Sequence, residues 1–364
     1  MKFAVKAVIG GRARVGRGEA RISGMLHLGP NPIETPALLL STRKGLLLFI
    51  SPDLLPCLPR PDSHLLQFSP PHFLDGPCPK TISSIGGLHQ MLGLHEYGFV
   101  AVARDSVQSL PEFDSTDKFG ASFETPCGRR LVHRILLSLS LLYVLVLYLQ
   151  VKPVEYMEMI SSMRPNLRTT LADEVPAWVS DKRNKTSVDR TVKWLDECIT
   201  LSPAGGTDFG SIVGGSIIEE RQRCAQEVAK RNVSGYWIGG FGLAESMDDR
   251  SPLLNAVTDN LPEERPRLIC GLGLTEEVLQ GIAAGVGTFL TRRGFALIFP
   301  LNGMKTSDIG SDGTKINLRA TMYRHKTHHY LGFFRSIRYA IKEGKFEEFQ
   351  NMFVQSRRSS CIPE

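Results

Sequence analysis

Residues 209–241 read FGSIVGGSIIEERQRCAQEVAKRNVSGYWIGGF, and the fold class follows from this stretch. It opens with an apolar run, 209–213, that ends in Gly214 and Gly215, as a buried strand does when it enters a tight turn. A helical pattern comes next, and a second apolar run, 236–238, also ends in a glycine pair. Because two parallel strands need a crossover between them, this order predicts a βαβ unit.

The helix of this unit is expected to begin at Ser216. A serine hydroxyl can accept a hydrogen bond from the first turn, and Glu219 is placed to complete a capping box. The positions predicted to be buried are Ile217, Cys224, Ala225 and Val228. The positions predicted to stay in water are Glu220, Arg221, Arg223, Glu227 and Lys230. The pattern indicates an amphipathic helix with one side against the strands.

The same unit recurs along the second half of the chain. Apolar runs typical of strands begin near residues 169, 209, 235, 267 and 294, with helical patterns between them. Such a succession of βα units favours a (β/α)8 barrel over a doubly wound sheet, which is the alternative. No GxGxxG loop follows an early strand, so a dinucleotide site is not indicated. The prediction is an α/β protein with a TIM barrel, complete or incomplete.

Two amphipathic helices are predicted at the C-terminal end, within residues 330–355. Their inward positions are Phe334, Ile337 and Ile341 on the first helix and Phe346, Phe349 and Phe353 on the second. Their outward positions form a basic face made of Arg335, Arg338, Lys342 and Lys345. That face either is solvated or contacts a phosphate backbone.

Composition sets only broad limits. A net charge of +6 permits a nucleic-acid partner without requiring one. The 7 cysteines are scattered, with no CxxC pair, which favours a reducing compartment. Cys198, Cys224 and Cys270 lie in apolar segments and are expected in the core.

Residues 135–151, ILLSLSLLYVLVLYLQV, carry no charge. The run lies at the lower limit of length for a membrane-spanning helix. A buried helix, or an added segment with no place in the fold, are the alternatives.

Reacting and ligand-binding groups of a TIM barrel lie at the C-terminal ends of its strands. Asp173 and Glu174 are the only carboxylate pair in such a position, and Gly239 and Gly240 follow a strand directly. Glycines let a flat ligand approach the backbone closely, so the pair could contact such a ligand. The alternative is that these glycines serve only a tight turn and that Asp173 caps a loop.

Several short motifs together resemble the queuine tRNA-ribosyltransferase family, also called tRNA-guanine transglycosylases. They are DEVPAW at 173–178, FGSIVGGS at 209–216, GYWIGGF at 235–241, PRLICGLG at 266–273 and HHYLGFFRSIR at 328–338, with IETPALLLSTRKG at 33–45 and FGASFETPCGRR at 119–130. The likeness is to the family's accessory subunit in a plant-like form. It implies one barrel domain over 1–355, interrupted by an apolar insertion at about 132–151, and a tail over 356–364.

The family is a (β/α)8 barrel with a zinc-bearing insertion near its C-terminus. Its catalytic members exchange guanine for queuine, in queuosine biosynthesis, at the wobble position of tRNAs with GUN anticodons. The resemblance implies that Asp173 reads the edge of the purine. It also implies that the backbone of Gly239 and Gly240 contacts the same base.

The chain departs from the catalytic members at the residues that make bonds. Their nucleophile is an aspartate in a GVDxFD run, whereas residues 285–290 read GVGTFL here. The early general-base aspartate has no counterpart, and the base-reading glutamine is replaced around 213–214. Without a carboxylate the covalent intermediate cannot form. The resemblance therefore implies a non-catalytic subunit of a glycosyltransferase complex.

The family's zinc site is also altered. Its CxCxxC motif and a later histidine supply four ligands, and only His325 matches, at the histidine position. His328 and His329 lie close by, so the three histidines could bind a metal or lie on the surface. The insertion and the missing residues indicate either an altered splice or gene model or a diverged paralogue.

The resemblance implies a cytoplasmic protein that forms a heterodimer with a catalytic queuine tRNA-ribosyltransferase subunit and binds tRNA. Association with the mitochondrial outer membrane is the second location that it allows. Two other hypotheses remain open. One is an independent TIM-barrel enzyme for a small heterocyclic or phosphorylated substrate, with Asp173 or Glu174 as the acid or base. The other is a protein tethered to a membrane through 135–151.

Overall fold

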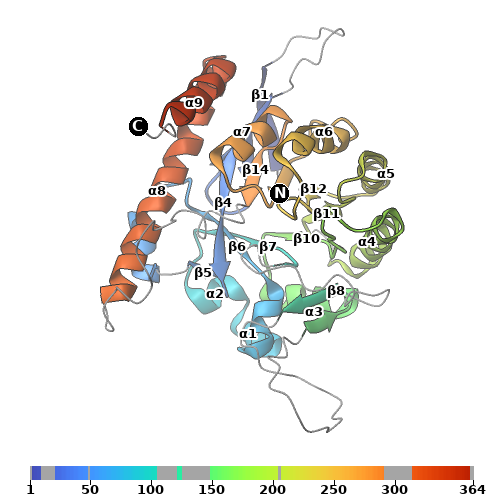
Figure 1. The fold of residues 1–364 in the computed structure, drawn as a ribbon. Helices are drawn as coiled ribbons and strands as arrows, with labels where there is room; N and C mark the ends of the chain where they lie inside the picture. Colours follow the sequence, from blue (N-terminus) through green and yellow to red (C-terminus); the bar gives the residue numbers. More distant parts are fainter. Residues whose placement is uncertain are drawn as a thin grey trace, which may run out of the picture.

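The computed structural model describes residues 2–9, 21–47, 50–104, 121–124, 148–203, 206–290 and 314–360. Its central feature is a closed parallel barrel (Figure 1). The barrel strands are β4 (Ala37–Arg43), β6 (Leu65–Phe68), β7 (Gly98–Ala101), β10 (Leu167–Thr169), β11 (Asp208–Ile212), β12 (Gly235–Ile238), β13 (Arg267–Cys270) and β14 (Thr288–Leu290). They pair in that order, and β14 pairs in parallel with β4, so the barrel is complete. A short strand, β5 (Leu46–Leu47), adds to β4 antiparallel.

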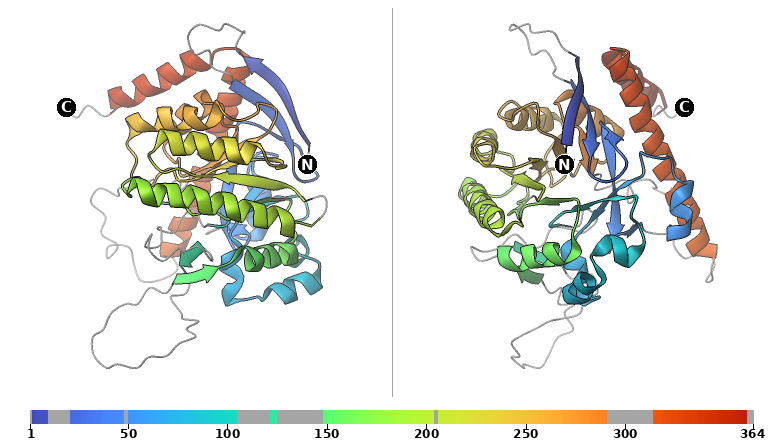
Figure 2. Two further views of the ribbon diagram at one scale, coloured as in Figure 1. Left: turned by 90° about the vertical axis from the view of Figure 1, so that its right-hand side faces the viewer. Right: turned by 180° about the vertical axis from the view of Figure 1, so that it is seen from behind.

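Helices surround the barrel, as the views from the side and from behind show (Figure 2). They are α1 (Pro79–Ile85), α2 (Leu88–Leu92), α3 (Pro153–Met163), α4 (Asp181–Leu201), α5 (Ile218–Ala229), α6 (Met247–Thr258), α7 (Thr275–Ala283) and α8 (Thr314–Lys342). A last helix, α9 (Phe346–Ser360), packs against α8 and runs past the predicted domain boundary at 355. Two 3-10 helices, η1 (Pro52–Cys57) and η2 (Pro70–Asp75), lie on either side of β6 in the chain.

A small antiparallel sheet covers the N-terminal end of the barrel. It consists of β1 (Lys2–Ile9), β2 (Arg21–His27) and β3 (Ile33–Glu34). Leu26 and Ile33 are buried in the same cluster as the barrel-lining Leu65. The barrel interior is therefore closed to solvent at this end, and its C-terminal end is the one left for a ligand.

The main core lies between the strands and the helices. Trp194, Tyr156, Phe289 and Phe334 are among its largest buried side chains. Burying a side chain of this size stabilises a fold by about 1.5–3 kcal/mol relative to exposing it. Cys198 and Cys224 are fully buried there, as predicted.

The C-terminal helices confirm the predicted apolar faces and correct the predicted basic face. Phe334, Ile337 and Ile341 are each at most 1% exposed. Arg338, however, is buried, and its guanidinium lies 2.7 Å from the carboxylate of Asp62. The reason is tertiary, because Asp62 lies in the loop before β6 and α8 packs over it. Residues of this face thus hold α8 to the barrel.

The apolar run of residues 135–151 lies mostly outside the described residues. Its last four residues form β9 (Tyr148–Val151), which pairs antiparallel with β8 (Ala121–Glu124). Within the described ranges, no helix has the length and apolar character needed to cross a membrane.

Two predicted strand positions need correction or lie outside the described residues. The strand expected from residue 169 ends at Thr169, because β10 is Leu167–Thr169. The strand expected at 294–300 lies outside the described residues. The place after α7 in the barrel is taken by β14, which pairs with β13 and β4.

The predicted cap of α5 is wrong. The Ser216 hydroxyl donates to the carbonyl of Ala177 at 2.7 Å, and the residue that precedes the helix is Ile217. The loop after β10 lies close enough in space for its Ala177 carbonyl to accept from this hydroxyl, a proximity that the spacing of residues in the sequence does not reveal. The serine therefore joins the loop after β10 to the loop after β11.

Candidate functional site

The loops after β10, β11, β12 and β13 meet at the C-terminal mouth of the barrel, and Asp173 lies in the first of them. Its side chain is 1% exposed, and its two carboxylate oxygens accept from Arg183 at 2.7 and 2.8 Å. Arg190 donates to the same carboxylate at 3.1 Å. Paired charge-assisted hydrogen bonds of this kind are strong and directional. Asp173 thus joins its loop to α4, and its role toward a purine stays a prediction.

Glu174 is the carboxylate that lies beside the glycine pair. Its Oε2 accepts from Arg104 at 3.1 Å and from the N–H of Gly240 at 3.2 Å. A Cβ at Gly239 would lie 3.1 Å from Glu174 Oε1, which is tighter than an ordinary contact. The structure therefore brings Gly239 and Gly240 together with Glu174, whereas the carboxylate of Asp173 binds Arg183 and Arg190 of α4.

Arg221 is the residue that organises this part of the mouth, and its predicted place in water is wrong. Its side chain is fully buried, with the guanidinium 4.0 Å from the ring centre of Phe241. It donates to the carbonyls of Gly215 at 2.7 Å, Gly239 at 3.2 Å and Gly240 at 3.0 Å. Burial lowers the pKa of Arg221 to about 10, so it stays charged at neutral pH.

The burial of Arg221 could have been predicted from its spacing in the sequence. Arg221 precedes Cys224, Ala225 and Val228 at the spacing of one helix face, and those three are buried. An arginine in line with a buried face, close to a glycine turn, can bind carbonyls that the turn leaves without partners.

The polar backbone groups of the glycine pair are already engaged. The N–H of Gly239 donates to Ile212 at 2.9 Å, and the N–H of Gly240 donates to Glu174. Both carbonyls accept from Arg221. A carbonyl oxygen has two lone pairs, so a base at this position can bind only by sharing these oxygens.

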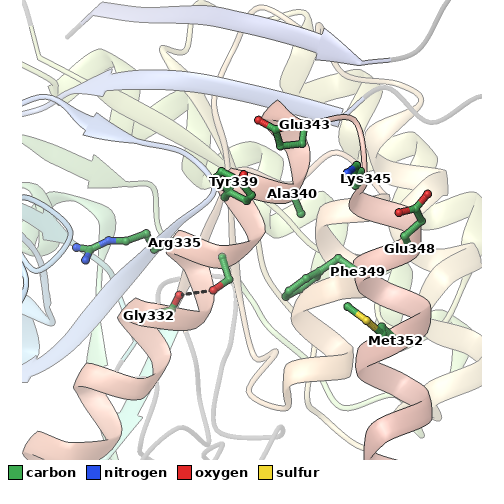
Figure 3. Close-up of a pocket in the computed structure, with 10 residues that line it drawn as sticks. Gly332, Arg335, Tyr339, Ala340, Glu343, Lys345, Glu348, Phe349 and Met352 are labelled. Carbon is green, nitrogen blue, oxygen red and sulfur yellow. Dashed lines mark hydrogen bonds between the residues drawn. The ribbon is translucent and has the colours of Figure 1, made fainter.

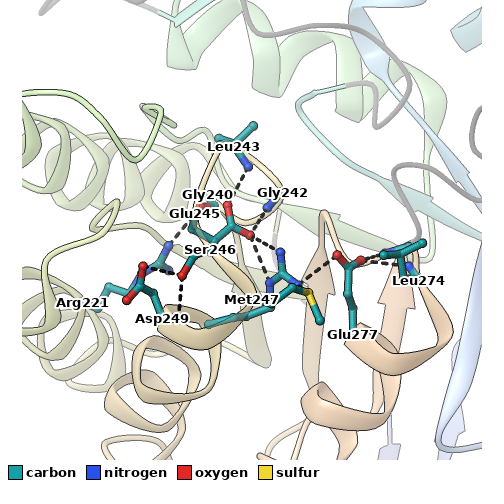
Figure 4. A network of polar contacts seen from close by, with 12 residues as sticks. Arg221, Gly240, Gly242, Leu243, Glu245, Ser246, Met247, Asp249, Leu274 and Glu277 are labelled. Carbon is teal, nitrogen blue, oxygen red and sulfur yellow. Dashed lines mark hydrogen bonds and ion pairs between the residues drawn. The ribbon is translucent and has the colours of Figure 1, made fainter. Parts of the chain in front are cut away.

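A second network holds the loops after β12 and β13 (Figure 4). The carboxylate of Glu245 accepts from the N–H groups of Gly242 at 2.6 Å and Leu243 at 2.8 Å. Arg250 lies between Glu245 and Glu277, at 2.9 Å from each. Burial acts to raise the pKa of Glu245, but the Gly242 and Arg250 hydrogen bonds hold that pKa below its ordinary value.

Glu277 also ends this network on the side of α7. Its Oε2 accepts from the N–H groups of Gly273 at 2.6 Å and Leu274 at 2.8 Å. The carboxylate thus binds N–H groups at the N-terminal end of α7, where negative charge is favourable. The hydroxyl of Tyr330 in α8 donates to the carbonyl of Gly273 at 2.7 Å, which links this loop to α8.

The residues present do not fit the family's zinc site. His325 is exposed on α8, and within the described ranges no three His, Cys, Asp or Glu side chains are grouped to hold a metal. The sequence has no cysteine between Cys270 and Cys361. The three thiolates of the family's four-ligand zinc site therefore have no counterpart in the sequence next to His325.

A groove of about 470 Å³ lies between α8 and α9 (Figure 3). Tyr339 and Met352 line it, with 67% and 65% of their surfaces exposed. Asp173, Gly239, Gly240 and His325 do not line this groove, whereas Arg335 and Lys345 of the predicted basic face do.

Comparison with known proteins gives a consistent result. The profile described as "Queuine tRNA-ribosyltransferase" matches residues 147–292. The "Queuine tRNA-ribosyltransferase accessory subunit 2" of Gallus gallus is 39% identical over 160 residues, which are 40% of this chain and 38% of that protein. The protein of the same name from Trichoplax adhaerens is 29% identical over 259 residues, 69% of this chain and 64% of that protein.

A relative from Synechococcus elongatus extends the comparison to a protein whose name lacks the words accessory subunit. The "Queuine tRNA-ribosyltransferase" of Synechococcus elongatus is 32% identical over 136 residues, 35% of each chain. The match spans less than two thirds of the length of each of these three relatives. Residues 147–292 are therefore similar to the queuine tRNA-ribosyltransferase family, and the chain resembles proteins named as its accessory subunit 2.

Proposed function

We propose that this chain is a non-catalytic subunit that supports the exchange of guanine for queuine at the wobble position of tRNAs with GUN anticodons. The observation that carries the proposal is the end of β14 at Leu290. By the resemblance, the GVGTFL run of residues 285–290, which ends in β14, stands where catalytic members have GVDxFD with their nucleophilic aspartate, and it contains neither aspartate. No side chain of this run is a carboxylate, so base exchange by covalent capture cannot occur at this position.

The other carboxylates at the mouth do not replace the missing aspartate. Asp173 is held by Arg183 and Arg190, and Glu174 by Arg104 and the Gly240 N–H. These donors occupy lone pairs of the carboxylate oxygens, which lowers their reactivity as nucleophiles. This arrangement supports an assisting role better than an independent acid-base enzyme.

What the chain can supply is a shaped and rigid surface. Arg221 binds the carbonyls of three glycines in two of the mouth loops, an arrangement called the Arg221 clamp below. Together with the Glu245–Arg250–Glu277 network, it holds the loops at the mouth in place. The proposal places the protein in the cytoplasm, in a heterodimer with a catalytic queuine tRNA-ribosyltransferase subunit, with tRNA as the shared substrate. The net charge of +6 suits a complex that binds a polyanion.

The test is reconstitution with a catalytic subunit. The full chain, the catalytic subunit, and a mixture of the two are each incubated with tRNA and labelled guanine, and label in tRNA is counted. We expect no incorporation by the chain alone, and more by the mixture than by the catalytic subunit alone. Failure of the two proteins to co-purify, with no gain in activity, would remove the proposal. Incorporation by the chain alone would instead favour an independent enzyme.

A further inference from the structure

The interior of the barrel changes from apolar to polar toward its C-terminal mouth. Side chains alternate along a strand, so Gln67 faces the interior with Leu65, and Thr169 faces it with Leu167. Leu65 and Leu167 belong to the apolar cluster inside the barrel. The next inward position on each of these strands is thus polar.

Gln67 and Thr169 lie in the same layer of the interior. Gln67 is in register with Val100 of β7, and Ala101 of β7 is in register with Arg168 of β10. A TIM barrel is staggered by one residue per strand, so moving from β6 to β10 in two steps places Thr169 at the height of Gln67. Two more steps, through β11, place Trp237 at that height as well.

Three side-chain atoms of this layer have no hydrogen-bond partner within the part of the chain that the structure describes. Gln67 is 0% exposed, and neither its Oε1 nor its Nε2 is hydrogen-bonded. Thr169 is 1% exposed, and its Oγ1 is not hydrogen-bonded either. Buried polar side chains nearly always have partners, so three such atoms in one layer require an explanation.

A further group without a full set of partners lies above this layer. Arg104 follows β7 and donates through Nη1 to Glu174, while its Nε and Nη2 have no acceptor. Its side chain is 14% exposed. Unpaired donors and acceptors therefore continue from the mouth into the interior.

We propose that Gln67 and Thr169 bind the polar edge of a planar nitrogen heterocycle that enters the barrel beneath Arg104 and Glu174. A carboxamide offers a donor and an acceptor side by side, which is the pattern by which glutamine pairs with a base edge. The threonine hydroxyl can donate or accept, and Trp237 contributes an aromatic surface at the same height. The inference rests on the proposed function, because it names residues of the same mouth beyond Asp173, Gly239 and Gly240.

The test is a titration of the purified full chain with guanine, in which binding is measured by tryptophan fluorescence and by calorimetry. We expect saturable binding that Gln67→Leu and Thr169→Val each weaken by about tenfold or more, because each removes hydrogen-bonding atoms. Without guanine, both variants should melt at a higher temperature than the natural chain, because each removes unpaired buried atoms. Gln226→Leu, at an exposed position of α5, is the matched control and should leave binding unchanged.

The result that overturns the inference is equal guanine binding by the natural chain and both variants, or no binding by the natural chain. If Gln67→Leu does not fold, Thr169→Val decides alone, since it keeps the shape of the side chain. This test needs no partner and no tRNA. If the chain binds guanine but does not assist a catalytic subunit, only the proposed function is contradicted. If it assists a catalytic subunit but does not bind guanine, only this inference is contradicted.

Discussion

Two polar regions of this barrel differ in how far their side chains are hydrogen-bonded. One is the rim, which is formed by the loops at the C-terminal mouth, and the other is the interior layer that contains Gln67 and Thr169. At the rim, Arg221, Glu245 and Glu277 are each engaged by two or more partners. In the interior layer below, Gln67 and Thr169 have buried atoms with no hydrogen-bond partner among the described residues. A group with all its partners stabilises a loop, whereas one without them has hydrogen-bonding capacity left for a ligand. These three rim residues therefore hold loops in place, whereas Arg104 at the mouth and the two interior side chains keep atoms that are unpaired within the described part of the chain.

The largest effect is expected from breaking the rim at its centre. Arg221→Met leaves three glycine carbonyls without their donor, in a region closed to water. We expect the free energy of unfolding to fall by about 3–5 kcal/mol, measured by urea denaturation. Arg223→Met on the same helix is the control, because Arg223 pairs with Glu220 and Asp189 at the surface. That variant should lose less than about 1 kcal/mol. Equal losses of unfolding free energy in the two variants would show that the buried hydrogen bonds of Arg221 stabilise the fold no more than the surface ion pairs of Arg223.

An intermediate effect on the free energy of unfolding is expected from replacing Glu245, and this effect depends on pH. Its folded-state pKa lies below its ordinary value, so its contribution to stability is present above the unfolded pKa. That contribution is lost as the pH falls through the folded-state pKa. Glu245→Gln should therefore cost about 1–2 kcal/mol at neutral pH and progressively less in acid. Thermal melting of both proteins from pH 7 to pH 3 measures this, and two parallel curves would contradict it.

The smallest effect is expected where the rim meets the glycine pair. A Cβ at residue 239 would press on Glu174, whose side chain can move, so Gly239→Ala should cost about 1 kcal/mol. In a Glu174→Ala background the same substitution should cost almost nothing, because the contacting atoms are gone. Urea denaturation of the four proteins gives the coupling. A cost that persists without Glu174 would show that the backbone, rather than this carboxylate, requires the glycine.

The parts of the fold that could be predicted are those with a local cause. The βαβ unit of residues 209–241 follows from periodicity and glycine turns, and β11, α5 and β12 confirm it. The inward phenylalanines of α8 and α9 follow from helical spacing in the same way. Of the surroundings of the candidate site, the sequence predicts less. It marks Glu174 only as one of a pair, and it wrongly predicts Arg221 in solvent, because an arginine is buried only when tertiary contacts supply its acceptors.

The sequence by itself determined the repeating strands and helices, the resemblance to a transglycosylase family and the lack of an aspartate in the GVGTFL run of residues 285–290. All of these depend on which residues occur and at what spacing. The tertiary structure alone decided that β14 pairs with β4, that Arg338 binds Asp62, and that Gln67 and Thr169 share one layer. These facts depend on which segments meet across the barrel, because its closure and stagger place residues far apart in the chain at one height.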